Sequence, residues 1–408
     1  MSDPNDGNKA VRFGNVTLKN PITVASGPLT DKFSKIEAAA KAGVGAVSFK
    51  LTFVNVPFNS QMRTFSLPGS VIMSPTNKRL DLKQAYAMMR QIKAELDVCM
   101  LANYSALGTA TDEWALMTER FLDAGTDMLE PNFCCPNLDT SDPRSKEAED
   151  HGGASIADHP DVCGELVTLM RKMTDRPIVP KVMPSTRSAL LRSCEAMRQA
   201  GADGVHVVGT PASGLPPLLD DGMPDMPLLE GIPQGSTNGS VCRYATYLSV
   251  AQVAQAVDLP LIASGGLDTW RDVIDALMWG ATGVGICSAI MWNGWEVVEQ
   301  MLTGIDDYLA RRGLSSLDEI RGVALSNFTT PDKVRLVEGH AFVDEEICIG
   351  CGRCLKPGHC EAVSMTDDEK ARVDPDECIG CGVCRSLCPV GAISYRIKET
   401  TETEVGAS

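Results

Sequence analysis

The sequence predicts an α/β protein, with a (β/α)8 barrel in residues 1–325 and a small cysteine-rich α+β domain in residues 326–408. Two patterns predict this organisation. Short apolar runs alternate with amphipathic helical runs through the first part, and a cysteine-bearing segment repeats itself in the second part. The chain of 408 residues also exceeds the roughly 250–300 residues at which a single core usually stops growing.

Eight apolar runs are predicted as the barrel strands, each followed by a helical run. The predicted strands are 22–25, 46–49, 99–103, 128–132, 178–182, 204–208, 259–263 and 283–287. The predicted helices include 32–42, 112–124, 160–173, 186–200, 269–279 and 294–312. A doubly wound open sheet is the alternative. It would normally bring a G-x-G-x-x-G motif after an early strand, and the sequence contains none.

The cysteine-rich part contains two copies of one motif, 343–354 and 373–384. Each copy carries cysteines at positions i, i+3 and i+6, and one further cysteine follows each copy. This is the spacing of a bacterial-type ferredoxin with two [4Fe–4S] clusters, in which the last cysteine of each run ligates the other run's cluster. One cluster is predicted on Cys348, Cys351, Cys354 and Cys388, and the other on Cys378, Cys381, Cys384 and Cys360.

Zinc is the alternative occupant of these cysteines. Zinc sites pair two close cysteines with two distant ligands, whereas each run here has three close cysteines and one distant, so iron–sulfur is favoured. Cys360 departs from the usual pattern, because five residues separate it from Cys354 where three are typical, and Glu361 rather than proline follows it. The copies return to register at Ala362 and Ala392, so Cys360 is kept as a predicted ligand.

Composition narrows the functional class. The net charge of −16 argues against nucleic acid and anionic membrane surfaces as partners. No run of 18 apolar residues is present, and the acidic start Met-Ser-Asp-Pro-Asn-Asp lacks the basic and apolar regions of a signal peptide. Fifteen cysteines in such a chain are better explained as cluster ligands and free thiols than as a disulfide framework. We therefore expect a cytoplasmic protein.

Candidate active-site residues stand where the predicted strands end, because (β/α)8 barrels place their chemistry at that face. In chain order these positions are 25–27, Lys50, Asn103, 132–137, Lys181, 209–210, 264–266 and 287–288. They supply small residues, amides, lysines and thiols. The glycine-bearing ends of the last two strands are where barrels bind phosphate through backbone N–H groups.

Several of these segments resemble the flavin-binding barrel of dihydroorotate dehydrogenases. They are 20–27, 48–50, 130–136, 263–266 and 286–288. The barrel followed by a two-cluster ferredoxin part resembles, more specifically, the catalytic region of dihydropyrimidine dehydrogenases. In bacteria that region can be a separate subunit, partnered by an NAD(P)-binding flavoprotein. The resemblance covers nearly the whole chain and implies FMN in the barrel.

The resemblance also implies roles for individual residues. The implied FMN contacts are Ala25, Ser26 and Gly27 at the ring, Lys50 and Lys181 at its N1/O2 edge, Asn103 and Asn132 facing ring and substrate, and Gly265, Gly266, Cys287 and Ser288 at the phosphate. Cations at an edge that gains negative charge on reduction stabilise a developing anion. A lysine at the end of an apolar run otherwise more often extends to solvent.

Cys135 is the implied acid, with Lys181 as the other implied catalytic residue. The matching cysteine of dihydropyrimidine dehydrogenases protonates one carbon of the substrate double bond while flavin N5 exchanges a hydride at the other. A thiol with an ordinary pKa of about 8.5 is protonated near neutral pH yet can release its proton. Adjacent Cys134 should face the opposite way if the strand persists. The polar segment 137–153 either closes over the site or is an ordinary solvated loop.

Two departures from the resemblance concern the substrate. The family carries an Asn-Thr pair after the sixth strand, where this chain has Gly209 and Thr210, and Asn137 stands where a histidine is typical. The predicted substrate contacts are therefore Asn132, Asn137, Gly209 and Thr210. Without that amide side chain, the site distinguishes less well between a substrate ring that forms hydrogen bonds and one that does not.

We expect an oxidoreductase that reduces, or reversibly oxidises, an activated C=C bond. Uracil or thymine to the 5,6-dihydropyrimidine is the first-choice substrate pair, and another conjugated alkene (an enone, unsaturated acid or amide) is the alternative. A dihydroorotate oxidase is disfavoured because its cluster normally lies on another subunit. An electron-transfer subunit with a barrel scaffold is the non-enzymatic alternative. The expected partners are an NAD(P)H-oxidising flavoprotein subunit or a ferredoxin, in a homodimer or larger complex.

Overall fold

The computed structural model describes residues 8–56, 61–135, 152–183, 186–209, 213–226, 228–232 and 235–397. The chain divides into two compact units, Met1–Phe328 and Thr329–Ser408, which are described separately below.

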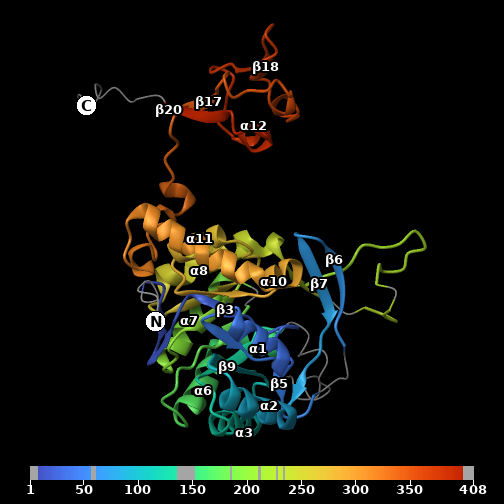
Figure 1. The fold of residues 1–408 in the computed structure, drawn as a ribbon, viewed down its shortest axis with the longest axis vertical. Coiled ribbons are helices and arrows are strands. Elements are labelled where there is room, and N and C mark those ends of the chain that lie inside the picture. The colour runs from blue at the N-terminus through green and yellow to red at the C-terminus, as the bar shows by residue number, and fades with distance from the viewer. Residues whose placement is uncertain are drawn as a thin grey trace. The chain divides into compact units, whose positions relative to one another are not determined.

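The first unit is built on a closed ring of eight parallel strands (Figure 1). These are β3 (Ile22–Val24), β4 (Ala46–Ser48), β9 (Cys99–Tyr104), β10 (Met128–Phe133), β11 (Lys181–Val182), β12 (Val205–Val208), β15 (Leu261–Ser264) and β16 (Gly283–Ile286). The ring closes through the β9–β10 and β16–β3 pairings. The predicted barrel is confirmed, and each of its eight predicted strands overlaps an observed one.

Helices cover the outside of the barrel. They are α1 (Phe33–Lys41), α2 (Leu82–Glu95), α3 (Thr111–Asp123), α6 (Pro160–Arg171), α7 (Arg187–Gln199), α8 (Arg243–Ala256), α9 (Trp270–Met278), α10 (Ser288–Asn293) and α11 (Glu296–Arg312). The helix predicted over 294–312 starts two residues later, because Gly294 has a φ of 72° and separates α10 from α11. Within the described part of the chain, no helix is both long and apolar enough to cross a membrane.

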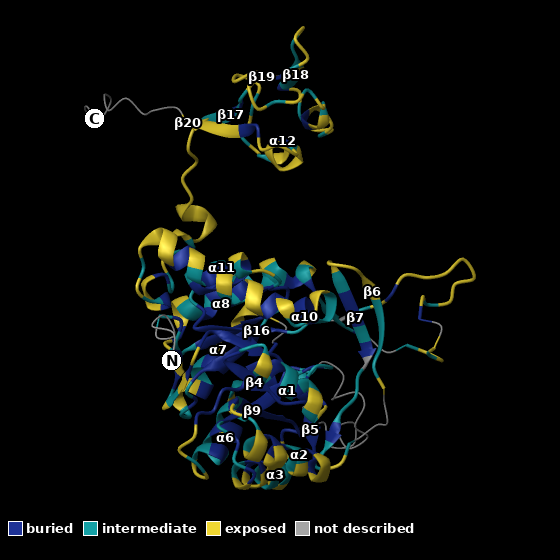
Figure 2. Cartoon of the chain, viewed as in Figure 1, coloured by how far each residue is buried: buried dark blue, intermediate teal, exposed yellow. Residues whose placement is uncertain are grey.

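The strands are buried on both faces, which explains their continuous apolar runs. β3, β4, β15 and β16 contain only buried residues, and Figure 2 shows this buried centre inside helices whose outer faces are exposed. Helix ends follow local chemistry: Asp81 accepts a hydrogen bond from Gln84 N and starts α2. Thr269 and Asp272 form a reciprocal capping box at α9.

Two segments inserted after barrel strands pair with each other in an antiparallel sheet. After β4 come β5 (Thr52–Phe53), β6 (Arg63–Leu67), β7 (Val71–Thr76) and β8 (Leu80–Asp81); after β12 come β13 (Ser213–Gly214) and β14 (Gly235–Asn238). The sheet order is β13-β14-β7-β6, while β5 and β8 extend the barrel sheet beside β9. The segment between β12 and α8 therefore contains two strands, β13 and β14. A hairpin of β1 (Val11–Phe13) and β2 (Val16–Leu18) precedes β3.

Beyond a short helical turn at η5 (Pro331–Lys333), the described part of the second unit contains two small antiparallel sheets and two short helices. β17 (Gly339–Val343) pairs with β20 (Ile393–Ile397), and β18 (Val363–Met365) pairs with β19 (Ala371–Val373). The short helices are η6 (Arg353–Leu355) and α12 (Val383–Leu387). The two sequence copies thus give matching elements, as expected for a ferredoxin-like domain.

Candidate active site and cluster sites

Strand register brings the predicted site residues together inside the barrel. Asn132 on β10 pairs with Lys181 on β11, which pairs with His206 on β12. On the other side, Glu130 pairs with Asn103 on β9. Side chains at the ends of adjacent parallel strands therefore face one another across the interior.

A buried polar network crosses the barrel beneath these residues. The Glu130 carboxylate lies 2.5 Å from His206 Nδ1, and His206 Nε2 lies 2.5 Å from Ser264 Oγ. Ser48 also donates to Glu130. Burial alone would raise the pKa of Glu130, but His206 and Lys181 hold it below its usual value. Burial lowers the pKa of His206, and the neighbouring Glu130 carboxylate opposes that shift.

This network continues to the Cys135 backbone through two amides. Asn103 Nδ2 donates to Glu130 Oε2 at 2.5 Å, and Asn132 Nδ2 donates to Asn103 Oδ1 at 3.1 Å. Asn132 Oδ1 then accepts from Cys134 N at 3.0 Å and from Cys135 N at 3.2 Å. Both side-chain carbonyls are occupied within the protein. Asn132 Oδ1 therefore accepts two hydrogen bonds and leaves only N–H for a ligand, whereas Asn103 Oδ1 accepts one and can accept another.

Lys181 is buried next to this network. Burial opposes the charge of its ammonium group, but the nearby Cys134 and Glu130 outweigh that cost and raise the pKa of Lys181. Glu130 is thus the internal counter-charge of Lys181. Neither Glu130 nor His206 was singled out from the sequence as a functional residue. Their signal is one polar residue inside each of two apolar strands.

Lys50 differs from Lys181 in the direction of its pKa shift, although neither lysine has a carboxylate at ion-pair distance among the described residues. Lys50 is 2% exposed, and its Nζ donates to Asn77 Oδ1 at 3.0 Å. Burial, with the positive charge of Arg79, lowers the pKa of Lys50 to about 7. The nearest carboxylate that affects it, Asp31, is already paired with Lys35 at 2.7 Å. Such a buried cation suits an anionic ligand.

The two adjacent thiols after β10 occupy different surroundings. Cys134 is buried, and burial raises its pKa to about 12. Cys135 is half-buried, packs on Leu51 and Phe53, and lies 3.9 Å from Arg79 Nη2. Only Cys135 combines partial exposure with a neighbouring cation. Arg79, which the sequence patterns did not suggest, is therefore part of this site.

Small residues line the opposite strand end. Ala25 follows β3 and donates its N–H to Ile286 O at 2.9 Å, while Ser26 is half-buried. A Cβ built on Gly27 would lie 2.8 Å from Cys287 Sγ, so no larger residue fits there without a shift. Cys287 also acts electrostatically on Lys50. The structure thus brings Cys287 to Gly27 and Lys50.

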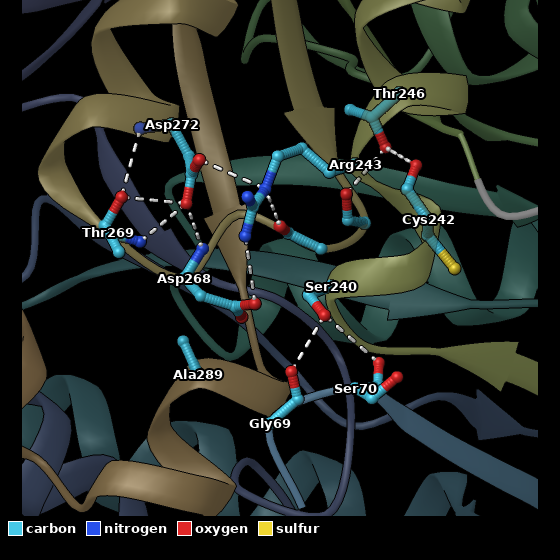
Figure 3. A network of polar contacts seen from close by, with 12 residues as sticks. Gly69, Ser70, Ser240, Cys242, Arg243, Thr246, Asp268, Thr269, Asp272 and Ala289 are labelled. Atoms are coloured by element: carbon cyan, nitrogen blue, oxygen red, sulfur yellow. Dashed lines mark hydrogen bonds and ion pairs between the residues drawn. The ribbon is translucent and has the colours of Figure 1, made fainter. Parts of the chain in front are cut away.

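The turn after β15 is held by the start of α8 (Figure 3). Gly265 and Gly266 have φ angles of 118° and 75°. Arg243 Nε donates to Gly266 O at 3.0 Å and lies 3.0 Å from Asp272 Oδ1, and Thr246 Oγ1 donates to Gly265 O at 2.7 Å. These carbonyls are occupied, which leaves the turn's N–H groups as its free polar atoms toward a ligand.

Three predicted substrate contacts have different outcomes. Gly209 lies against α8, and a Cβ there would collide with the Thr246 backbone, so helix packing explains the glycine. Thr210 and Asn137 lie outside the described residues. Ser288, at the start of α10, is buried beside Cys287.

The eight predicted cluster ligands line two separate cavities in the second unit. One is lined by Cys348, Cys351, Cys354 and Cys388. The other is lined by Cys360, Cys378, Cys381 and Cys384. Each cavity therefore takes three cysteines from one copy of the motif and one from the other copy, and Cys360 keeps its place despite the longer spacing.

Backbone groups in this unit point at sulfur, as iron–sulfur ligation requires. Ala341 N lies 3.4 Å from Cys378 Sγ, and Ala392 N lies 3.2 Å from Cys388 Sγ. Hydrogen bonds from the Ala371 and Gly350 backbone lower the pKa of Cys348. Burial raises the pKa of Cys354 in the same cavity. A cavity lined by four cysteines, with backbone N–H groups directed at sulfur, fits a cubane cluster.

The barrel site likewise fits a flavin. It has a buried ammonium group without a carboxylate partner (Lys50), a floor where side chains larger than glycine are excluded (Gly27), and a glycine turn with free N–H groups after β15. A barrel with such a site, joined to two four-cysteine cavities, defines an oxidoreductase that combines a flavin with iron–sulfur clusters.

Comparisons with known proteins give the family. A family model described as dihydroorotate dehydrogenase matches residues 9–309, and one described as 4Fe-4S dicluster domain matches residues 341–395. The chain belongs to the dihydroorotate dehydrogenase family. It is similar over 94% of its length, at 26% identity, to the NAD-dependent dihydropyrimidine dehydrogenase subunit PreA of Escherichia coli K12, of which 94% is covered.

The barrel alone is similar to shorter relatives. The catalytic subunit of dihydroorotate dehydrogenase B (NAD(+)) from Petrotoga mobilis is 28% identical over 77% of this chain and 98% of its own length. The corresponding subunit from Pyrococcus abyssi is 27% identical over 77% of this chain and 97% of its own length. The family binds FMN and the dicluster domain holds two [4Fe–4S] clusters, which confirms the expected cofactors. The protein is a flavin and iron–sulfur oxidoreductase acting on CH–CH bonds.

Proposed function

We propose that the protein reduces an activated C=C bond, with uracil or thymine to the 5,6-dihydropyrimidine as the first-choice substrate pair. The observation that carries the proposal is Cys135, a half-buried thiol held by Asn132 beside the buried cations. The similarity to the Escherichia coli dihydropyrimidine dehydrogenase subunit, which spans both units, supports this substrate class.

In this proposal FMN, when bound, supplies the hydride, and the residues of the chain do the rest. Lys50 and Lys181 stabilise negative charge on the reduced ring. Ala25, Ser26 and Gly27 line the ring, and the N–H groups of the Asn103 and Asn132 side chains face ring and substrate. The backbone of Gly265, Gly266, Cys287 and Ser288 binds the phosphate.

Cys135 provides the proton in the proposed reaction. Its thiol gives a proton to one carbon of the double bond. Asn132 holds the Cys135 backbone N–H and thereby positions the thiol. Residues Asn137, Gly209 and Thr210 remain proposed substrate contacts.

The eight cysteines of the second unit would hold two [4Fe–4S] clusters, which supply one-electron transfer between an outside donor and the barrel. The proposed donor is an NAD(P)H-oxidising flavoprotein subunit or a ferredoxin, in a homodimer or larger complex. A cytoplasmic location suits the free thiols. We further propose the boundary between the barrel and the linker at residues 325–326.

The test is anaerobic purification, followed by FMN, iron and sulfide analysis and a reoxidation assay. The chemically reduced holoprotein is mixed with uracil, thymine or a neutral enone, and flavin absorbance is followed by stopped flow. Rapid reoxidation by uracil or thymine is expected. If only the enone reoxidised the flavin, uracil and thymine would be ruled out as substrates. If the purified protein contained no flavin, the proposal that it is an enzyme would be wrong.

A further inference from the structure

A histidine side chain lies against one of the cluster-site cysteines in the second unit. His359 Nε2 lies 3.4 Å from Cys381 Sγ, and both residues are exposed. Cys381 lines the second cavity together with Cys360, Cys378 and Cys384. A thiolate bound to iron carries no proton, so the ring N–H of the histidine is the donor in this contact. The contact therefore directs a hydrogen bond at a sulfur atom that would ligate the cluster.

The longer spacing before Cys360 places this histidine. Five residues separate Cys354 from Cys360, where three are typical. Cys360 N donates to Pro357 O at 3.1 Å and closes a turn, and His359 is the third residue of that turn. Pro357, His359 and Cys360 all line the cavity. The turn that brings the cysteine to the cavity therefore also brings the imidazole to it.

The first cavity has different surroundings. Apart from its four cysteines, its described lining consists of apolar residues and glycines, among them Val390 and Ala392. Cys351 stands where Cys381 stands in the other copy of the motif. Among the described residues that line its cavity, no side-chain donor other than the cysteines is present. The two cluster sites are therefore unlike at this one sulfur.

Two backbone donors, by contrast, are shared by the two cavities. Ala341 N lies 3.4 Å from Cys378 Sγ in the second cavity, and the Ala371 backbone donates a hydrogen bond to Cys348 in the first. The two alanines stand at matching places just before the two copies of the motif. Since these donors act alike on both clusters, they do not distinguish them. His359 does.

We propose that His359 donates its Nε2–H group to Cys381 Sγ and thereby raises the reduction potential of the second cluster. Reduction adds one electron, which increases the negative charge on the sulfurs, so a hydrogen-bond donor stabilises the reduced form more than the oxidised form. A cluster that is easier to reduce holds an electron longer, which suits a cofactor chain whose flavin collects electrons one at a time. The inference rests on the proposed cysteine ligation and not on the proposed substrate.

The test is a potentiometric titration of the purified holoprotein, with the reduced clusters followed by electron paramagnetic resonance. His359→Phe keeps a planar ring but removes the N–H donor. The equilibrium constant for reduction of one cluster should fall by about threefold to tenfold, and tenfold corresponds to about 59 mV for one electron. The potential of the other cluster should stay unchanged. His359→Gln keeps an N–H donor and should restore most of the lost potential.

His340→Phe is the matched control, because it makes the same change at the other histidine of this unit. His340 lies on β17 next to Ala341, and neighbouring side chains on a strand point to opposite faces. Both potentials should stay unchanged in this variant. His359→Ala removes the donor without adding bulk and should match His359→Phe. Glu361 and Glu377 also line the cavity but are the same in every variant, so their negative charges do not enter the comparison.

The inference would be overturned if His359→Phe and His359→Ala both kept the potentials of the unmodified protein. It would also be overturned if His359→Gln lowered the potential as far as His359→Phe, because the effect would then come from side-chain shape or solvent access. These measurements need no substrate. If reduced holoprotein were not reoxidised by any C=C acceptor, the proposed function would be refuted and the role of His359 would stand. If iron and sulfide analysis gave no cluster at these cysteines, the ligation on which the inference rests would be wrong.

Discussion

The two units of the chain are stabilised in different ways. The barrel unit has a large continuous apolar core contributed by strands and covering helices. The buried cluster of the second unit is small, and two of its members are the cysteines Cys354 and Cys384. The barrel can therefore fold around its own side chains, whereas the second unit places its cofactor ligands where a core would otherwise be.

The largest expected effect follows from removing a cluster ligand. Cys384→Ala deletes a proposed ligand that is also part of the small buried cluster, so we expect loss of iron and of ordered structure throughout the second unit. The barrel should keep its helical signal and FMN. Hydrogen exchange, with iron and sulfide analysis, would measure this. If the second unit stayed protected from hydrogen exchange in protein without iron, the inference that its cluster ligands stand in for an apolar core would be wrong.

The next effect concerns thiols of the barrel. Cys135→Ala should reduce substrate-dependent flavin reoxidation by about 10²–10⁴-fold, the range typical of general acid catalysis. Cys134→Ala is the matched control, because its thiol is buried and its pKa is raised to about 12. Stopped-flow absorbance would measure both variants. If flavin reoxidation were unimpaired in Cys135→Ala, Cys135 would not be the proton donor.

Stability of the barrel interior should depend on Glu130. Glu130→Gln removes the buried carboxylate that contacts His206 and favours the charged form of Lys181, and we expect a loss of about 3–5 kcal/mol in the free energy of unfolding at pH 7. The folded-state pKa of Glu130 is lowered, so its contribution is present above pH of about 4.5 and is lost as pH falls through the folded pKa.

Denaturant titrations at several pH values would measure this difference. Glu195→Gln is the control, because Glu195 is an exposed partner of Arg198 on α7 and should change stability little. Equal losses in the two variants would show that the Glu130 network does not stabilise the interior.

The smallest effect is a pH dependence at Lys50. Its pKa of about 7 means that a protein without FMN holds a neutral Lys50 above that pH. A hydrogen bond from charged Lys50 to the N1/O2 edge of FMN then requires uptake of a proton, so FMN affinity should fall by up to about tenfold per pH unit above pH 7. The FMN-free protein should instead gain stability as pH rises from about 7 toward 10.5.

Fluorescence titration with FMN between pH 6 and 9 would measure the affinity. In Lys50→Met the slope should vanish, while Lys83→Met should retain it. A slope that persists in Lys50→Met would assign the titration to another group.

Sequence patterns predicted the barrel well because its strands are short, apolar and buried on both faces. They missed the sheet of β6, β7, β13 and β14, since its β7–β14 pairing joins segments far apart in the chain through partly polar strands. The cysteine cavities followed from spacing alone. The Glu130–His206 contact could not be predicted in the same way, because 76 residues separate the two partners. Arg79 gave no signal, since only the fold brings it to Cys135.

The crossed origin of the cysteines has a consequence for biosynthesis. The cavity that begins at Cys348 is completed only by Cys388, and the other cavity combines Cys360 with three later cysteines. Iron delivered while translation is still passing between the two copies would meet an incomplete set of thiolates. Maturation of the first centre must therefore wait until the ribosome has released Cys388, and that of the second until it has released Cys384.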